Sequence, residues 1–219
     1  MLPQSPFRSH EMTNLPLTTP IHIEGSLGTG CRAIFLDRDG VINEDHGYVG
    51  TWDRFDFVHG ALEGIKILNG LGYRVIVVTN QSGIGRGLYT QDMFVELTKR
   101  MLDEIADYGA RVDAVYACPH FDTQKEIDCD CRKPKPGMIL AALAKYHLSA
   151  ELSFLVGDKA ADISAAKSAG VNQTALVTTR LKDRQDTNAE AKWHVRDLIE
   201  FALFIQQLND TIVSPTDTL

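Results

Sequence analysis

The sequence lacks the features that mark membrane-bound and secreted proteins. None of the apolar runs among its 219 residues is long enough to cross a bilayer. Residues 1–20 contain no continuous apolar core of the kind found in a signal peptide. Only four cysteines are present, and three of them are clustered. We therefore expect a cytoplasmic protein with reduced thiols, in which clustered cysteines are more often metal ligands or catalytic groups than disulfides.

Positive charge is also scarce. The 22 lysine and arginine residues are outnumbered by 29 aspartate and glutamate residues, which gives a formal net charge of -7. An acidic surface argues against broad binding to nucleic acid or to anionic membranes, although it is compatible with a small basic pocket for a phosphate. Common nucleotide signatures are missing as well. Gly83, Gly85 and Gly87 match neither the Walker pattern nor the dinucleotide-binding pattern, so a flexible turn is expected there.

The chain does contain an alternation of apolar strands and amphipathic helices. Five short apolar runs predict buried strands at Arg32–Asp37, Tyr73–Thr79, Asp113–Ala117, Ser153–Val156 and Thr174–Val177. Apolar residues three or four positions apart predict helices over Ala61–Leu71, from a cap at Thr90 to Ile105, over Met138–Tyr146 and over Ala161–Ala169. This order predicts an α/β domain with a mostly parallel sheet and helices on both faces.

The domain is expected to span residues 31–207. Residues 1–30 are rich in Pro, Ser, Thr and Gly without periodicity, which predicts a loose N-terminal extension. Residues 208–219 are predicted to form a polar C-terminal tail. No internal repeat is apparent. Ligands of such sheets bind beyond the carboxyl ends of the strands, so the residues that follow the predicted strands are the first candidates for a site.

Acidic residues follow two of these strands. Asp37 and Asp39 end the run FLDRD, and Gly40 after them permits an unusual backbone turn. Asp158 lies in a second acidic cluster, VGDKAAD, that also follows a buried strand. An isolated Asp-x-Asp is most often a solvated turn, but carboxylates from two strand ends can converge on one Mg²⁺ ion. Thr79 and the backbone of the glycine-rich turn after it could hold a phosphoryl group.

These strand ends supply the groups that phosphoryl transfer to an aspartate requires. They offer a carboxylate nucleophile, a second carboxylate for proton transfer, a hydroxyl, a metal site and a cation from Lys133. A carboxylate is a weak nucleophile toward a phosphate dianion, and Mg²⁺ together with Lys133 would offset the repulsion.

Three cysteines and a histidine lie together in segment 118–131, directly before a burst of positive charge. Cys118, His120, Cys129 and Cys131 offer four N and S ligands, the number that fills a tetrahedral structural zinc site. Their one-residue gaps are tighter than the spacing of standard zinc fingers. A redox pair at Cys129 and Cys131 is the alternative, although the usual Cys-x-x-Cys spacing is missing. A filled zinc site would leave no open position for water and would be structural.

Four motifs resemble those of the haloacid-dehalogenase (HAD) superfamily, in the same order and at strand ends. They are FLDRDGVIN, VVTNQSG, CRKPKPGM and VGDKAADI. Within it, DHGYV at Asp45–Val49 and the Cys-x-His…Cys-x-Cys loop that runs into CRKP resemble the D-glycero-D-manno-heptose 1,7-bisphosphate phosphatase family. The resemblance covers residues 33–177. It implies a HAD-type three-layer α/β/α, Rossmann-like fold without a separate cap domain and with an inserted zinc loop at 118–131.

The resemblance also implies a role for each matching residue. Asp37 would attack phosphorus and form an aspartyl-phosphate, and Asp39 would protonate the leaving sugar oxygen and then activate water. Thr79 and Lys133 would hold the transferred phosphoryl group. Mg²⁺ would be held by Asp37, the main-chain carbonyl of Asp39 and Asp158, and Zn²⁺ by the cysteine–histidine set. The expected substrate contacts are Asp45, His46, Gly47, Tyr48, Asn80, Gln81, Ser82, Arg132 and Lys159.

The reaction implied is Mg²⁺-dependent removal of the 7-phosphate of a heptose 1,7-bisphosphate by a monomer, in the biosynthesis of ADP- or GDP-heptose precursors. Arg132 would contact the phosphate that is not cleaved. Histidinol-phosphate phosphatase is the nearest alternative, and DHGYV with the Arg132–Lys133 pair favours the sugar bisphosphate. A phosphatase of DNA 3′ ends is disfavoured by the acidic charge and the lack of a basic stripe. The alternative of another class is a non-catalytic zinc loop that binds nucleic acid or protein.

Three further residues have more ordinary interpretations. Asp162 is expected to order the loop or a neighbouring lysine rather than to bind metal. His46 could have an exposed or structural role as easily as a substrate contact. Cys31, distant in sequence from the cluster, is expected to be an isolated free thiol.

Overall fold

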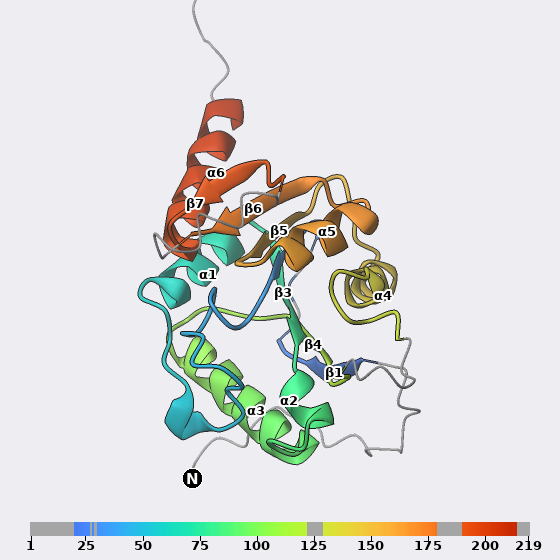
Figure 1. Cartoon of the computed structure of the whole chain (residues 1–219). Coiled ribbons are helices and arrows are strands. Elements are labelled where there is room, and N and C mark those ends of the chain that lie inside the picture. The colour runs from blue at the N-terminus through green and yellow to red at the C-terminus, as the bar shows by residue number, and fades with distance from the viewer. Residues whose placement is uncertain (1–19, 27, 29, 122–128, 179–189, 214–219) are drawn as a thin grey trace, which may run out of the picture.

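The computed structural model describes residues 20–26, 28, 30–121, 129–178 and 190–213. Within these residues, a seven-stranded sheet has the order β1-β4-β3-β2-β5-β6-β7 (Figure 1). The strands are β1 (Ile21–Glu24), β2 (Ala33–Leu36), β3 (Arg74–Asn80), β4 (Ala114–Cys118), β5 (Phe154–Gly157), β6 (Gln173–Val177) and β7 (Trp193–Val195). Neighbouring strands pair in parallel, except that β1 pairs with β4 antiparallel.

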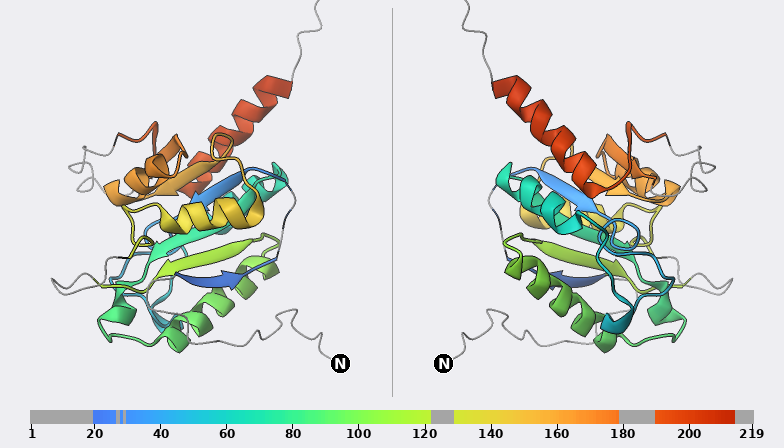
Figure 2. Two further views of the ribbon diagram at one scale, coloured as in Figure 1. Left: turned by 90° about the vertical axis from the view of Figure 1, so that its right-hand side faces the viewer. Right: turned by 90° about the vertical axis from the view of Figure 1, so that its left-hand side faces the viewer.

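Helices cover both faces of this sheet. They are η1 (Trp52–Arg54), α1 (Ala61–Gly70), α2 (Ser82–Gly85), α3 (Gln91–Asp107), α4 (Gly137–Tyr146), α5 (Ala160–Ser168) and α6 (Leu198–Val213). Figure 2 shows α1, α3 and α6 on one face and α4 and α5 on the other. The molecule therefore has the three-layer α/β/α arrangement expected from the sequence.

Strand periodicity divides the apolar residues between two cores. Along β2, Ile34 and Leu36 belong to the core beneath α1, α3 and α6, whereas Phe35 belongs to the core beneath α4 and α5. Successive side chains of a strand point to opposite faces, so a run that is buried throughout fills both cores at once. This explains why the central strands read as nearly continuous apolar segments.

The parallel strands bring the candidate residues to one edge of the sheet. Leu36 pairs with Val156, which places the residues after β2 beside those after β5. On the other side of β2, the last residues of β3 and β4, Asn80 and Cys118, are partners in register. The carboxyl ends of β2, β3, β4 and β5 thus share one edge, as ligand sites in such sheets require.

The five predicted strands and four predicted helices are confirmed to within two residues at each end. The Thr90 cap is also present, since its hydroxyl oxygen accepts the N–H of Met93 at 3.2 Å. The expected loose extension over residues 1–30 is wrong for residues 21–24, which form β1 against β4. Residues 1–19 lie outside the described ranges.

The C-terminal end of the domain also differs from the expectation. Helix α6 continues to Val213, beyond the expected boundary at 207. Its buried residues Leu198, Phe201, Ala202 and Ile205 pack on the same core as α1, and this packing supports a helix whose last turns are polar. Residues 214–219 lie outside the described ranges. None of the helices in the described ranges combines the length and apolarity of a membrane span.

Candidate active site

A buried ion pair lies at the end of β2. The backbone N–H of Asp37 donates to the Val156 carbonyl at 2.9 Å, which continues the β2–β5 pairing into the site. The Lys133 ammonium donates to Asp37 Oδ1 at 2.8 Å and to the Val78 carbonyl at 2.7 Å. It also pairs with Asp162 Oδ1 at 2.6 Å. Burial alone would lower the pKa of Lys133, but the carboxylates of Asp162 and Asp37 raise it to about 12, so the cation is retained.

Three carboxylates crowd around this lysine. Asp37, Asp158 and Asp162 each offer an oxygen, and these oxygens lie within 4.8 Å of one another. Burial, with the charge of Asp37 added to it, raises the pKa of Asp158 to about 8, and burial also raises the pKa of Asp37. Oδ1 of Asp158 is buried and has no hydrogen-bond partner. Crowded, partly unpaired carboxylate oxygens are the donor set that suits a hard cation such as Mg²⁺.

Asp162 is occupied by lysine and backbone contacts. Besides its ion pair with Lys133, its Oδ2 accepts the backbone N–H of Lys159 at 3.0 Å, at the start of α5. This agrees with the expectation that Asp162 orders the loop and a neighbouring lysine. These contacts occupy both oxygens of Asp162, whereas the lysine and backbone contacts of Asp37 both fall on its Oδ1. Asp37 and Asp158 therefore have oxygens available for a metal. Gly40 leaves room for Asp158, because a Cβ at position 40 would lie 2.5 Å from Asp158 Oδ2.

Asp39 is not a member of the cluster of three carboxylates, and its own carboxylate is surrounded by donors. Its Oδ1 accepts from Arg38 Nη2 at 2.8 Å and from Asn43 Nδ2 at 3.0 Å. Its Oδ2 accepts from Gln81 Nε2 at 3.0 Å. The Asp39 side chain is 16% exposed, whereas that of Arg38 is 1% exposed. These donors hold the Asp39 carboxylate at the edge of a separate pocket.

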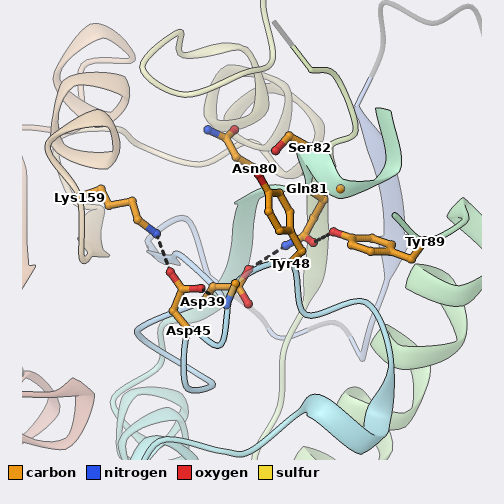
Figure 3. Close-up of a pocket in the computed structure, with 10 residues that line it drawn as sticks. Asp39, Asp45, Tyr48, Asn80, Gln81, Ser82, Tyr89 and Lys159 are labelled. Atoms are coloured by element: carbon orange, nitrogen blue, oxygen red, sulfur yellow. Dashed lines mark hydrogen bonds and ion pairs between the residues drawn. The ribbon is translucent and has the colours of Figure 1, made fainter. Parts of the chain in front are cut away.

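This pocket joins three segments at the same edge of the sheet (Figure 3). Its lining residues are Asp39, Asp45, Gly47, Tyr48, Asn80, Gln81, Ser82, Gly83, Tyr89 and Lys159. On one side, Lys159 Nζ donates to Asp45 Oδ2 at 3.2 Å. Burial alone would raise the pKa of Asp45, but Lys159 holds it below the ordinary value. The pocket thus offers both charges and several hydrogen-bonding groups to a polar ligand.

Most of the expected substrate residues meet in this pocket, and two do not. His46 is exposed and its Nε2 pairs with Asp56 Oδ2 at 2.9 Å, away from the lining residues. Arg132 donates from Nη1 to the His120 carbonyl at 3.0 Å, which ties it to the cysteine loop. Neither residue lines the pocket, so a substrate contact of His46 or of Arg132 stays a prediction. Two lining residues, Gly83 and Tyr89, were not expected from the sequence. Tyr89 reaches the pocket only because the chain folds back after β3.

Asn80 links the pocket to the ion pair. Its side-chain amide donates to the Lys133 carbonyl at 3.0 Å and its oxygen accepts the Lys133 N–H at 3.1 Å. This pair of bonds fixes the backbone of Lys133 against the end of β3, which aims the ammonium group at Asp37.

The cysteine loop forms a second polar cluster. The ligand atoms of Cys118, His120, Cys129 and Cys131 lie within 4.8 Å of one another, and all four side chains are buried. Cys118 Sγ lies 3.7 Å from Cys129 Sγ and 3.3 Å from His120 Nδ1, and Cys131 Sγ lies 3.2 Å from the same nitrogen. Sulfur atoms at about 2.3 Å from a tetrahedral zinc ion would be about 3.8 Å apart, so these spacings fit zinc. The spacer 122–128 lies outside the described residues.

Comparisons with known proteins agree with this geometry. A sequence model of the HAD-hydrolase-like family matches residues 130–201. The D-glycero-beta-D-manno-heptose-1,7-bisphosphate 7-phosphatase of Pasteurella multocida (strain Pm70) is 42% identical over 180 residues, which cover 81% of this chain and 98% of the relative. The protein of the same name from Escherichia coli (strain K12) is 41% identical over 180 residues, which cover 80% of this chain and 94% of the relative.

A solved structure resembles the fold as well. The D,D-heptose 1,7-bisphosphate phosphatase from B. bronchiseptica, in complex with magnesium and phosphate, superposes with a TM-score of 0.73 at 32% identity. The match covers 81% of this chain and 99% of that chain. With the strand-end motifs, the carboxylate cluster and these matches together, the chain belongs to the HAD superfamily, within the heptose 1,7-bisphosphate phosphatase family.

Proposed function

We propose that this protein is a Mg²⁺-dependent phosphatase that removes the 7-phosphate of D-glycero-D-manno-heptose 1,7-bisphosphate and leaves heptose 1-phosphate. The observation that carries the proposal is the buried contact of Lys133 with Asp37 beside Asp158, next to a pocket that Asp39 lines. The named activity of the relatives supports the substrate. Because their names specify the β-anomer, we propose the β-bisphosphate as the preferred form.

In the first step, an oxygen of Asp37 attacks phosphorus, and the bond between phosphorus and the sugar oxygen breaks. The sugar oxygen takes a proton from Asp39, which lines the pocket where the sugar would lie. Lys133 and the Thr79 hydroxyl stabilise the negative charge of the transferred group. The Asp37 side chain is only 7% exposed, as expected for a nucleophile in a site that excludes water. The Lys133 ammonium that faces it keeps its proton and therefore its positive charge.

In the second step, water attacks phosphorus while Asp39 takes a proton from it. The bond to Asp37 breaks, phosphate leaves and the carboxylates return to their starting state. Asp37, Asp158 and the main-chain carbonyl of Asp39 are the residues that would hold Mg²⁺, which when bound neutralises charge on the phosphoryl oxygens. Cys118, His120, Cys129 and Cys131 would hold a structural Zn²⁺.

The remaining pocket residues are proposed to bind the sugar and its second phosphate. In Figure 3, Lys159 and Asp45 lie together on the left, Asn80 and Ser82 lie toward the top, and Tyr48 lies between the Lys159–Asp45 pair and Tyr89. Arg132 is proposed to contact the phosphate that stays, from the end of the cysteine loop. Zinc-bound thiolates need a reducing compartment, which supports a cytoplasmic location.

The test is phosphate release from four candidate substrates, with and without Mg²⁺. They are heptose 1,7-bisphosphate as the β-anomer, the same compound as the α-anomer, histidinol phosphate and a 3′-phosphorylated oligonucleotide. We expect Mg²⁺-dependent release with the highest kcat/KM on the β-bisphosphate. A higher kcat/KM on histidinol phosphate would overturn the substrate, and no release from any compound would overturn the enzymatic function.

A further inference from the structure

Gln81 joins two groups of the reaction through one side chain. Its Nε2 donates to Asp39 Oδ2 at 3.0 Å and to Thr79 Oγ1 at 2.8 Å. The side-chain amide has two N–H donors, and both are taken by these contacts. Gln81 is also only 2% exposed. Although Gln81 borders the pocket, its amide has no N–H left for a ligand.

A third contact fixes which way the Gln81 amide faces. The Tyr89 hydroxyl donates to Gln81 Oε1 at 2.6 Å. A rotation of the amide by half a turn would break this bond and bring Oε1 against the Asp39 carboxylate, where two acceptors would repel. Burial raises the pKa of Tyr89 to about 12, so its hydroxyl keeps the proton that it donates.

The Tyr89 ring is itself held by close backbone approach on two sides. A Cβ at Gly50 would lie 2.3 Å from the ring, and a Cβ at Gly83 would lie 2.2 Å from it. Any larger residue at either position would displace the ring. The chain from Gly83 to Tyr89 to Gln81 is thus a packed support behind Asp39, as catalytic groups require when their orientation controls the rate.

We propose that Gln81 is a positioning residue, which acts on the reaction by orienting Asp39 and not by contact with the substrate. Tyr89 supports it by holding the orientation of its amide. This inference rests on the proposed function, because it assumes that Asp39 transfers the proton to the leaving group. It differs from the role of substrate contact that the sequence suggested for Gln81.

The dependence on the leaving group distinguishes the two roles. A sugar alkoxide is a poor leaving group and needs the proton from Asp39, whereas p-nitrophenolate departs without one. A lost Asp39 orientation would therefore slow the first turnover of the bisphosphate and spare the first turnover of p-nitrophenyl phosphate. A lost substrate contact would raise KM for the sugar and leave kcat unchanged.

The experiment uses the full chain with Mg²⁺ and compares first-turnover rates on heptose 1,7-bisphosphate and p-nitrophenyl phosphate. For Gln81→Met, which keeps the length of the side chain, we expect about a tenfold slower first turnover of the bisphosphate and a change within about twofold for p-nitrophenyl phosphate. Slower loss of phosphate from Asp37 would then appear as a burst of p-nitrophenol. A higher KM with unchanged kcat, or an equal loss on both substrates, overturns the proposal.

Two further variants keep the test decisive. Tyr89→Phe removes only the hydroxyl, and we expect the same selective loss at about two- to threefold. If Gln81→Met fails to fold, Tyr89→Phe decides, and an unchanged ratio of the two rates overturns the proposal. Tyr73→Phe is the matched control, because it removes the hydroxyl of another buried tyrosine. Tyr73 directly precedes β3, at the end of the strand away from Gln81. The parent protein could be inactive on the bisphosphate but active on other alkyl phosphates. That result would overturn the proposed function but not the positioning role of Gln81. The ratio of first-turnover rates would then be measured with such an alkyl phosphate in place of the bisphosphate.

Discussion

The ammonium group of Lys133 and Oδ1 of Asp37 are 2.8 Å apart, and both side chains are almost completely buried. The two residues are separated by 96 positions in the chain. They meet because the segment after the cysteine loop returns to the end of β3, where Asn80 holds its backbone. The proposed nucleophile and the cation proposed to stabilise its reaction are thus positioned by two segments that the sheet brings together.

Asp37→Asn should remove turnover and preserve the fold. The amide cannot form the aspartyl-phosphate, so we expect kcat to fall at least about a thousandfold. Because the change removes one of three crowded carboxylates, the melting temperature should stay the same or rise. Phosphate release and thermal unfolding measure the two effects. Near-normal release would contradict the assignment of the nucleophile.

Lys133→Met should destabilise the protein strongly. The change leaves Asp37 and Asp162 buried without their shared cation, which costs about 3–5 kcal/mol for a broken buried pair. Lys167→Met is the control, because Lys167 pairs at the surface with Glu190, which is 91% exposed, and should change the free energy of unfolding by less than about 0.5 kcal/mol. Urea unfolding gives the free energy of unfolding of both variants. Equal losses of this free energy would argue against the buried contacts of Lys133 with Asp37 and Asp162.

Gly40→Ala should weaken Mg²⁺ binding. Gly40 has a φ of 88°, and a Cβ there would press on Asp158 Oδ2. We expect a loss of about 1–2 kcal/mol of stability from the backbone alone, and a higher Mg²⁺ concentration for half-maximal phosphate release. Gly70→Ala, at a helical position with no atom of another segment within 4 Å of the new Cβ, is the control. It should stabilise the protein by up to about 1 kcal/mol and leave the Mg²⁺ dependence unchanged. An unaltered Mg²⁺ dependence in Gly40→Ala would count against Asp158 as a ligand.

Cys129→Ser should remove a metal ion that the parent protein carries. Elemental analysis is expected to find one zinc per chain in the parent and much less in the variant, with a lower melting temperature, because a structural site contributes to folding directly. Cys31→Ser changes an exposed thiol outside the cluster and should retain the zinc. A Cys129→Ser protein with full zinc content and activity would disprove the structural site.

Arg132→Ala should affect a bisphosphate substrate more than a monophosphate. The expected loss of the second phosphate contact is about tenfold in kcat/KM, in line with a charge-assisted hydrogen bond. Arg132 also donates to the His120 carbonyl, so zinc content must be measured in parallel to exclude damage to the loop. Equal losses on heptose 1,7-bisphosphate and heptose 7-phosphate would remove Arg132 from substrate selection.

The central strands and the residues after them were predictable because burial on both faces leaves a clear apolar signature. Strand β2 is fully buried, and Asp37 directly after it stands out against that background. Strand β1 gave no such signal. Three of its four residues are partly buried and Glu24 is exposed, and the two isoleucines alternate with polar residues. They form a strand because β4 offers them a free edge. That edge exists only in the folded protein.

Side-chain contacts that depend on how a loop closes account for what the sequence could not predict in the site. Tyr89 reaches Gln81 only after the turn beyond β3 closes, and no local pattern marks it. His46 belongs to the DHGYV motif, yet the loop turns its ring toward Asp56. A motif therefore identifies the segment that borders the pocket, whereas the direction of each side chain depends on φ and ψ of a loop with residues such as Tyr48 at φ 52°.

The cysteine loop also bears on how this family can vary. Cys118 and Cys129 bring the two ends of the intervening segment to within 3.7 Å between their sulfur atoms. With both ends fastened, additional residues between them would cost only the slowly growing entropy of loop closure, about 0.6 kcal/mol for a doubled length. Insertions between His120 and Cys129, which spare the four proposed zinc ligands, should leave the position of Lys133 unaltered.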